Sequence, residues 1–122
     1  KMIGRVYEAT QAQAVQACEA AAAAQTTWRK LPGVERARYL QRLADALVAR
    51  ADAIGEMLAL ESGKSVADAS SEALYAADIT RYHAEWGRRI EGEVLPSDSA
   101  SENLLLLREP IGVVVCLIPF NF

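Results

Sequence analysis

The residues best suited to chemistry lie at the end of the chain, in Leu117-Ile118-Pro119-Phe120-Asn121-Phe122. The proline follows an apolar run and ends strand pairing there, which presents the Asn121 amide at the edge of a sheet. An asparagine amide donates two N–H bonds without being ionised, so it can stabilise a developing oxyanion. The alternative is a loop asparagine that caps a turn, and local chemistry alone favours this second interpretation.

The single histidine and the two cysteines are weaker candidates. His83 is expected in the middle of a helix, where a partly exposed structural role is favoured over catalysis. Cys18 falls on an alanine-rich helix face and behaves as a small hydrophobic residue. Cys116 falls in an apolar strand, whereas a nucleophilic thiol needs a nearby cation or helix N-terminus to lower its pKa. The two cysteines make neither a disulfide framework nor a zinc pattern.

The helices that must position these residues follow from apolar spacing and capping residues. Thr10, with Gln13 three residues later, predicts the start of a helix that ends near residues 26–28. A second helical segment begins near Val34, bends near Arg50 and ends at Gly63 in a left-handed conformation. A third helix is predicted over residues 65–90. Its expected buried side comprises Ala69, Ala73, Ala76, Ala77, Thr80, Tyr82 and Trp86.

Two strands are predicted near the end of the chain. Residues 103–108 form a short apolar run, and residues 111–118 are nearly all β-branched or aliphatic. Such an uninterrupted apolar run is typical of a strand buried on both faces, as in a parallel α/β sheet. This strand needs neighbouring strands and covering helices, and mainly helical sequence precedes it. We therefore expect that the chain is the N-terminal part of a larger protein. We also expect that residues 1–122 do not fold by themselves.

The composition excludes several classes of protein. With 122 residues, 52% hydrophobic and 24% charged, the chain is too apolar to be disordered. A net charge of −3 leaves no basic surplus for a nucleic-acid partner. The longest charge-free apolar stretch, residues 110–122, is shorter than the roughly 20 residues of a membrane-spanning helix, so no membrane partner is expected. No metal-ligand pattern and no glycine-rich phosphate loop occur, and the start lacks a signal-like segment, which favours the reducing cytoplasm.

An ordered series of short motifs links these elements to a known family. The motifs are Trp28, Val34-Glu35-Arg36, Glu61-Ser62-Gly63-Lys64, Glu85-Trp86, Arg108-Glu109-Pro110-Ile111-Gly112-Val113 and Ile118-Pro119-Phe120-Asn121-Phe122. In this order and spacing, the chain resembles the N-terminal region of the NAD(P)-dependent aldehyde dehydrogenase superfamily. Residues 85–93 and 103–106 look most like the lactaldehyde and glycolaldehyde dehydrogenase branch. Semialdehyde dehydrogenases carry similar segments, and Phe120 stands where tryptophan is commoner.

The resemblance implies an α/β fold of the aldehyde dehydrogenase type. In it, N-terminal helical segments lead into the first strands of a Rossmann-like parallel sheet. Residues 1–93 would form the helical part of the cofactor-binding domain, and residues 94–109 the connection and strand toward the oligomerisation region. Residues 110–122 would form the first buried strand of the Rossmann-like domain. The resemblance also implies a homodimer or homotetramer.

The implied activity is oxidation of an aldehyde to a carboxylic acid with NAD or NADP. In such enzymes a cysteine thiolate attacks the carbonyl, hydride passes to the nicotinamide, and a glutamate-activated water hydrolyses the thioester. Asn121 matches the asparagine that stabilises the oxyanion. The strand end and loop along which the cofactor lies are matched by Leu117, Ile118, Pro119 and Phe120. The family's nucleophile and general base match no residue of this chain, including Cys116, and Glu61-Ser62-Gly63-Lys64 matches a structural helix end.

Two other functions stay open on the sequence. One is a coenzyme A-acylating aldehyde dehydrogenase, which shares the fold but releases the thioester to a thiol instead of water. The other is a non-catalytic helical interaction module, which explains the helices but not the apolar strand or the P-F-N-F ending. A G-Q-x-C segment in the complete gene would distinguish the enzymes from the module.

Overall fold

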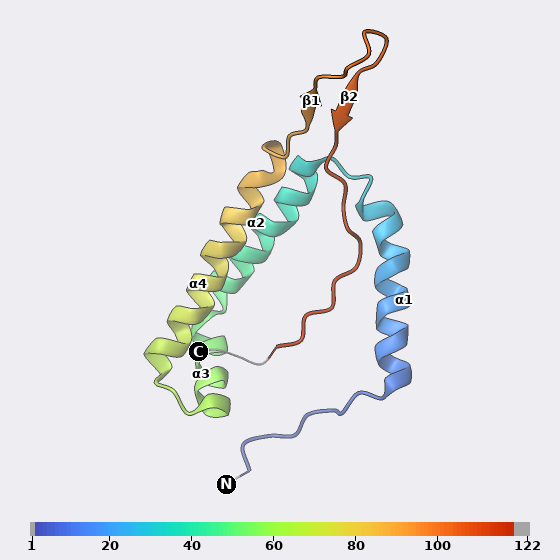
Figure 1. Cartoon of the computed structure of the whole chain (residues 1–122). Helices are drawn as coiled ribbons and strands as arrows, with labels where there is room; N and C mark the ends of the chain where they lie inside the picture. The colour runs from blue at the N-terminus through green and yellow to red at the C-terminus, as the bar shows by residue number, and fades with distance from the viewer. Residues whose placement is uncertain (1, 119–122) are drawn as a thin grey trace. The chain divides into compact units, whose positions relative to one another are not determined.

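The first helix begins and ends where its local chemistry predicts. A computed structural model describes residues 2–118, and in it α1 spans Gln11–Trp28 (Figure 1). The Gln13 N–H donates to the Thr10 hydroxyl at 3.3 Å, and the Thr10 N–H donates to the Gln13 side-chain oxygen at 2.8 Å. This reciprocal capping box satisfies two N–H groups that a helix start otherwise leaves without partners. The predicted start and end of this helix are confirmed.

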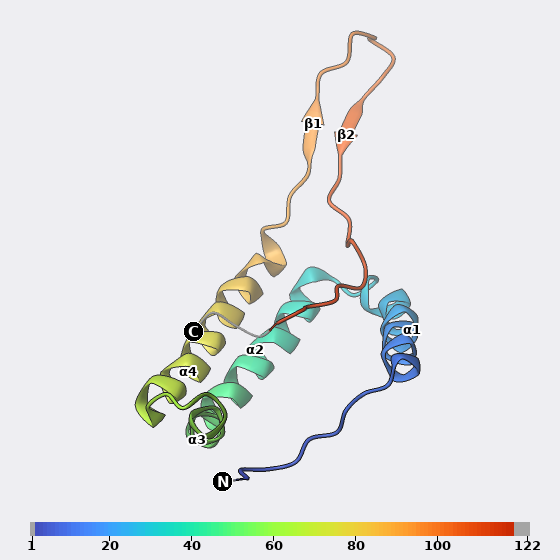
Figure 2. The same cartoon turned by 60° about the horizontal axis from the view of Figure 1, so that its bottom comes forward.

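The remaining helices form one of two units into which the chain divides, residues 1–6 with 32–91. Its elements are α2 (Gly33–Ala49), α3 (Ala51–Ser62), α4 (Val66–Glu85) and the short 3₁₀ helix η1 (Trp86–Arg88). Figures 1 and 2 show α2 and α4 running side by side in opposite directions, and α3 packs against α4. The predicted break near Arg50 is confirmed, since Arg50 separates α2 from α3.

Alanine and glycine set how closely these helices approach. The buried side chains are all alanines: Ala37, Ala44, Ala51, Ala69, Ala73, Ala77 and Ala84. A Cβ atom added to Gly33 would lie 2.3 Å from the Gly87 carbonyl oxygen, and one added to Gly55 would lie 2.1 Å from the Ser70 hydroxyl oxygen. Real atoms cannot approach so closely, so the absence of a side chain at each glycine is what permits the contact.

The buried face of α4 differs in part from the prediction. Ala69, Ala73 and Ala77 are buried as expected, but Tyr82 is 55% and Trp86 is 45% exposed. Trp86 follows Ala77 by nine residues, which at about 100° per residue places it on the opposite side of the helix. Helix α4 packs against both α2 and α3, and the side chains buried along it are alanines. The helix is also shorter than predicted, because its last turn tightens into η1.

The other unit, residues 7–31 with 92–122, contains α1 and a two-stranded antiparallel sheet. No residue of α1 is buried in the described part of the chain. Strand β1 (Glu93–Leu95) pairs with β2 (Leu104–Leu106), and Val94 lies opposite Leu105. Strand β2 falls inside the run predicted at 103–108. Strand β1 lies outside both runs that were predicted as strands.

The structure differs from the prediction at residues 111–118. These residues belong to no helix or strand, and their side chains are exposed. The physical reason is a lack of partner strands among the described residues. A strand buried on both faces needs hydrogen-bonded neighbours, and within residues 2–118 the only pairing is that of β1 with β2. No helix in the described part of the chain is long and apolar enough to cross a membrane.

Candidate functional site

The predicted catalytic and cofactor-binding residues lie at or beyond the end of the described chain. Leu117 and Ile118 are 93% and 84% exposed and belong to no helix or strand. Pro119, Phe120 and Asn121 lie outside the described residues. The roles of these residues stay a prediction.

The other chemically capable side chains do not assemble a second catalytic site. No group of three histidine, cysteine, aspartate or glutamate residues within 2–118 could hold a metal ion. The His83 ring is exposed and meets the edge of the Tyr82 ring, with 5.2 Å between centroids. Cys18 and Cys116 are free and exposed, so the burial expected of Cys116 is not observed. The exposure of His83 on α4 fits the structural role that was favoured over catalysis.

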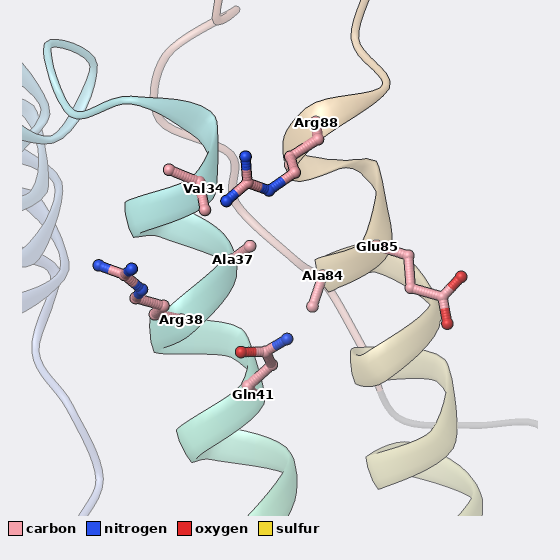
Figure 3. A pocket seen from close by; sticks show the side chains of 8 residues that line it. Val34, Ala37, Arg38, Gln41, Ala84, Glu85 and Arg88 are labelled. Carbon is pink, nitrogen blue, oxygen red and sulfur yellow. The ribbon is translucent and has the colours of Figure 1, made fainter.

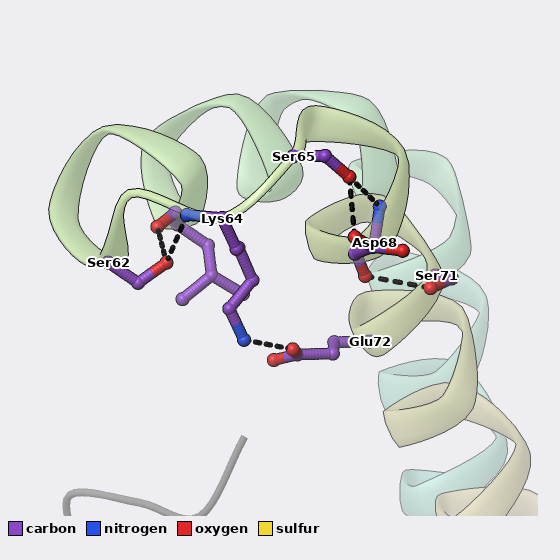
Figure 4. A network of polar contacts seen from close by, with 7 residues as sticks. Ser62, Lys64, Ser65, Asp68, Ser71 and Glu72 are labelled. Carbon is purple, nitrogen blue, oxygen red and sulfur yellow. Dashed lines mark hydrogen bonds and ion pairs between the residues drawn. The ribbon is translucent and has the colours of Figure 1, made fainter.

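The motif Glu61-Ser62-Gly63-Lys64 builds the turn between α3 and α4 (Figure 4). Gly63 has φ 77°, a left-handed conformation that glycine adopts without steric cost, and its N–H donates to the Ala59 carbonyl at 2.9 Å. The Ser62 hydroxyl donates to the Leu58 carbonyl at 2.6 Å. The first of these bonds satisfies a carbonyl in the last turn of α3, where carbonyls lack intrahelical partners. The motif is the capped helix end that the sequence predicted.

The same turn is closed by side chains from the start of α4. The Lys64 ammonium forms an ion pair and hydrogen bond with Glu72, and both side chains are partly buried. The Ser65 hydroxyl accepts a hydrogen bond from the Asp68 N–H at 3.1 Å and so caps α4. The local sequence around Lys64 did not predict this partner, which lies eight residues later in the chain. The sequence feature that could have indicated this pair is an acidic residue, Glu72, two turns into the next helix.

We expect Gly63→Ala to lower the free energy of unfolding of the full-length protein by about 1 kcal/mol, because a Cβ is strained in the left-handed conformation. Gly63→Asn is the matched comparison, since asparagine tolerates this conformation better and should cost less. Denaturant unfolding of both variants beside the parent protein measures the difference. Equal stability of the alanine variant and the parent would contradict the role assigned to Gly63.

A cavity of about 310 Å³ lies between α2, α4 and η1 (Figure 3). Its apolar wall consists of Val34, Ala37 and Ala84. The charged and amide side chains that line it are Arg38, Gln41, Glu85 and Arg88. It lies beside the close contact of Gly33 with Gly87, which sets the local spacing between α2 and η1.

Comparison with known proteins places the chain in a family. A model of the aldehyde dehydrogenase family matches residues 1–122. The lactaldehyde dehydrogenase of Escherichia coli (strain K12) is 37% identical over 121 residues, which are 99% of this chain and 25% of that enzyme. The NADP-dependent glyceraldehyde-3-phosphate dehydrogenase of Streptococcus equinus is 40% identical over 125 residues, covering 98% of this chain and 26% of that enzyme.

The structure agrees with this similarity. The crystal structure of lactaldehyde dehydrogenase from Escherichia coli matches with a TM-score of 0.83 at 37% identity, over 86% of this chain and 22% of that one. The chain thus spans about a quarter of the length of the curated relatives it matches. The predicted α/β fold of the aldehyde dehydrogenase type is confirmed. The division at residues 93 and 109 stays a prediction.

Proposed function

This chain belongs to the aldehyde dehydrogenase family, and from that membership we propose that the protein oxidises an aldehyde to a carboxylic acid with NAD or NADP as hydride acceptor. The observation that carries the proposal is the family match over residues 1–122. The similarity in structure to lactaldehyde dehydrogenase supports it independently of the short motifs.

The part of the reaction proposed for this chain is stabilisation of charge. Attack on the aldehyde turns its carbonyl oxygen into an oxyanion, and the Asn121 amide would donate an N–H bond to that oxygen. The nucleophilic cysteine and the general-base glutamate of the family match no residue of this chain. Asn121 is therefore the catalytic residue proposed here, a role that rests on its match to the family motif.

The described part of the cofactor segment fits one wall of a nucleotide site. Leu117 and Ile118 present exposed apolar side chains, which suit contact with the apolar faces of a dinucleotide. Neither side chain offers a charge or a phosphate-binding group, so they would line the site without selecting NAD or NADP. Pro119 and Phe120 complete the proposed segment. When bound, the dinucleotide supplies the acceptor for the substrate hydride.

The proposed substrates are lactaldehyde-like aldehydes or semialdehydes, and the proposed assembly is a homodimer or homotetramer. The similarity to lactaldehyde dehydrogenase supports the first substrate class. The open edges and exposed leucines of the β1–β2 hairpin support assembly, because an unpaired edge can be covered by a further strand.

The proposed compartment is the cytoplasm. The free thiols of Cys18 and Cys116 agree with its reducing conditions.

The experiment is an assay of the full-length protein with lactaldehyde, glycolaldehyde and succinate semialdehyde, each with NAD and with NADP. We expect reduced cofactor and free carboxylic acid in equal amounts. As a control, Cys116→Ala should keep kcat within about twofold, because Cys116 matches no catalytic position. An acyl-coenzyme A product formed only on addition of coenzyme A would assign the acylating class instead. A folded protein that reduces neither cofactor would refute the proposal.

A further inference from the structure

Three charged side chains line the cavity between α2, α4 and η1, and two of them are neutralised by neighbours. Arg38 forms an ion pair with Glu35 on the same helix. Glu85 forms an ion pair with Arg89, with 3.3 Å between Oε2 and Nη1. The Arg88 guanidinium forms no ion pair or hydrogen bond with any described residue. The cavity therefore carries one uncompensated positive charge.

The polar groups that remain available point into the cavity. Figure 3 shows the Arg88 guanidinium reaching from η1 toward Val34 on α2, while the Gln41 amide reaches from α2 toward Ala84 on α4. The charged ends of Arg38 and Glu85 point away from this space. One cationic donor and one neutral donor thus face the same space from opposite helices.

We infer that this cavity binds a short-chain monocarboxylate, held by Arg88 and Gln41. A planar guanidinium matches the two oxygens of a carboxylate, and an amide offers further N–H donors. The alkyl part of the ligand would lie against Val34, Ala37 and Ala84, of which Ala37 and Ala84 are buried. Ligand sites commonly have volumes of about 300–1,000 Å³. The cavity volume of about 310 Å³ is at the lower end of this range, so a carboxylate with a short alkyl chain fits best.

The charge balance argues against other small ligands. A single uncompensated arginine balances one negative charge, whereas a phosphate dianion would leave a charge without a partner. A metal ion needs several converging acidic or imidazole ligands, and Glu85 is the one such side chain among the described lining residues. Its carboxylate is paired outside the cavity with Arg89.

The test is titration calorimetry of the full-length protein with sodium butyrate and, separately, with inorganic phosphate, at constant ionic strength. We expect saturable butyrate binding. Arg88→Gln should weaken its affinity by about tenfold or more, the change expected when charge-assisted hydrogen bonds are lost. Arg42→Gln is the matched control: this guanidinium on α2 is exposed, lies over the Tyr39 ring and does not line the cavity, so butyrate affinity should change by about twofold at most.

The inference is overturned if butyrate does not bind, if phosphate binds more tightly than butyrate, or if both variants keep the parent affinity. The last outcome would place butyrate elsewhere, for example where the carboxylic acid product leaves. Equal weakening in both variants would also overturn it, because only the general charge would then matter. Binding is measured without aldehyde or dinucleotide, so the result does not depend on the proposed activity. Arg88 is exposed, so its replacement is not expected to prevent folding.

Discussion

Replacement of Asn121 by alanine in the full-length protein should lower kcat by about 10²–10³, the typical cost of removing one oxyanion donor. The hydrogen bond strengthens as the carbonyl becomes tetrahedral, so its loss acts on the rate more than on binding. Steady-state kinetics with the best aldehyde substrate measures the effect, and fluorescence titration should show little change in dinucleotide affinity. Asn121→Asp should be at least as damaging, because a carboxylate repels the oxyanion.

The chain contains a matched control for this experiment. Asn103 is its only other asparagine, and it lies exposed just before β2. Asn103→Ala should keep kcat within about twofold, as surface substitutions usually do. If Asn121→Ala keeps kcat within a factor of about three, the lost energy is too small for an oxyanion donor. Asn121 would then be the turn residue that its local chemistry suggests.

The second large effect is expected at Gly55, in the middle of α3. A Cβ added there would lie 2.1 Å from the Ser70 hydroxyl oxygen and 2.7 Å from the Ser70 backbone nitrogen on α4. Gly55→Ala should therefore lower the free energy of unfolding by about 1–3 kcal/mol, the usual cost of overpacking. On an exposed helix the same substitution would stabilise by about 1 kcal/mol, so the sign of the effect reports the contact. Denaturant unfolding of the full-length protein measures it.

Two further variants separate the causes. Gly4→Ala should change stability little, since nothing lies within 4 Å of a Cβ at Gly4. Ser70→Ala combined with Gly55→Ala should rescue only part of the loss, because the backbone of Ser70 remains in the way. A Gly55→Ala protein as stable as its parent would mean that α3 and α4 are not packed as closely as the structure has them.

Features set by neighbours a few residues apart in the chain were predictable. The capping box of Thr10 and Gln13, the break at Arg50 and the left-handed Gly63 each depend on hydrogen bonds or sterics within one helical turn. The family was predictable for a related reason. Its short motifs keep their order and spacing along the chain, and recognising them requires no contact between distant residues.

Features set by distant partners were not predictable from local pattern. The face of α4 that carries Tyr82 and Trp86 has the same apolar spacing as the alanine face, and only packing against α2 and α3 decides which is buried. The pairing of Lys64 with Glu72 likewise depends on the direction in which α4 leaves the turn. An apolar side chain in the sequence indicates that burial is favourable at that position. It does not identify the element that covers it, because that element lies elsewhere in the chain.

The sequence by itself determined the start and end of α1, the break at Arg50, the capped turn at Gly63 and the family of the protein. Tertiary structure decided the contact of Gly55 with Ser70, the pairing of β1 with β2, and the arrangement of charges around Arg88. It also decided that residues 111–118 form no strand here, although their sequence strongly favours one. The reason is common to all four: helical hydrogen bonds form within one segment, whereas a strand or a close-packed interface exists only with its partner in place.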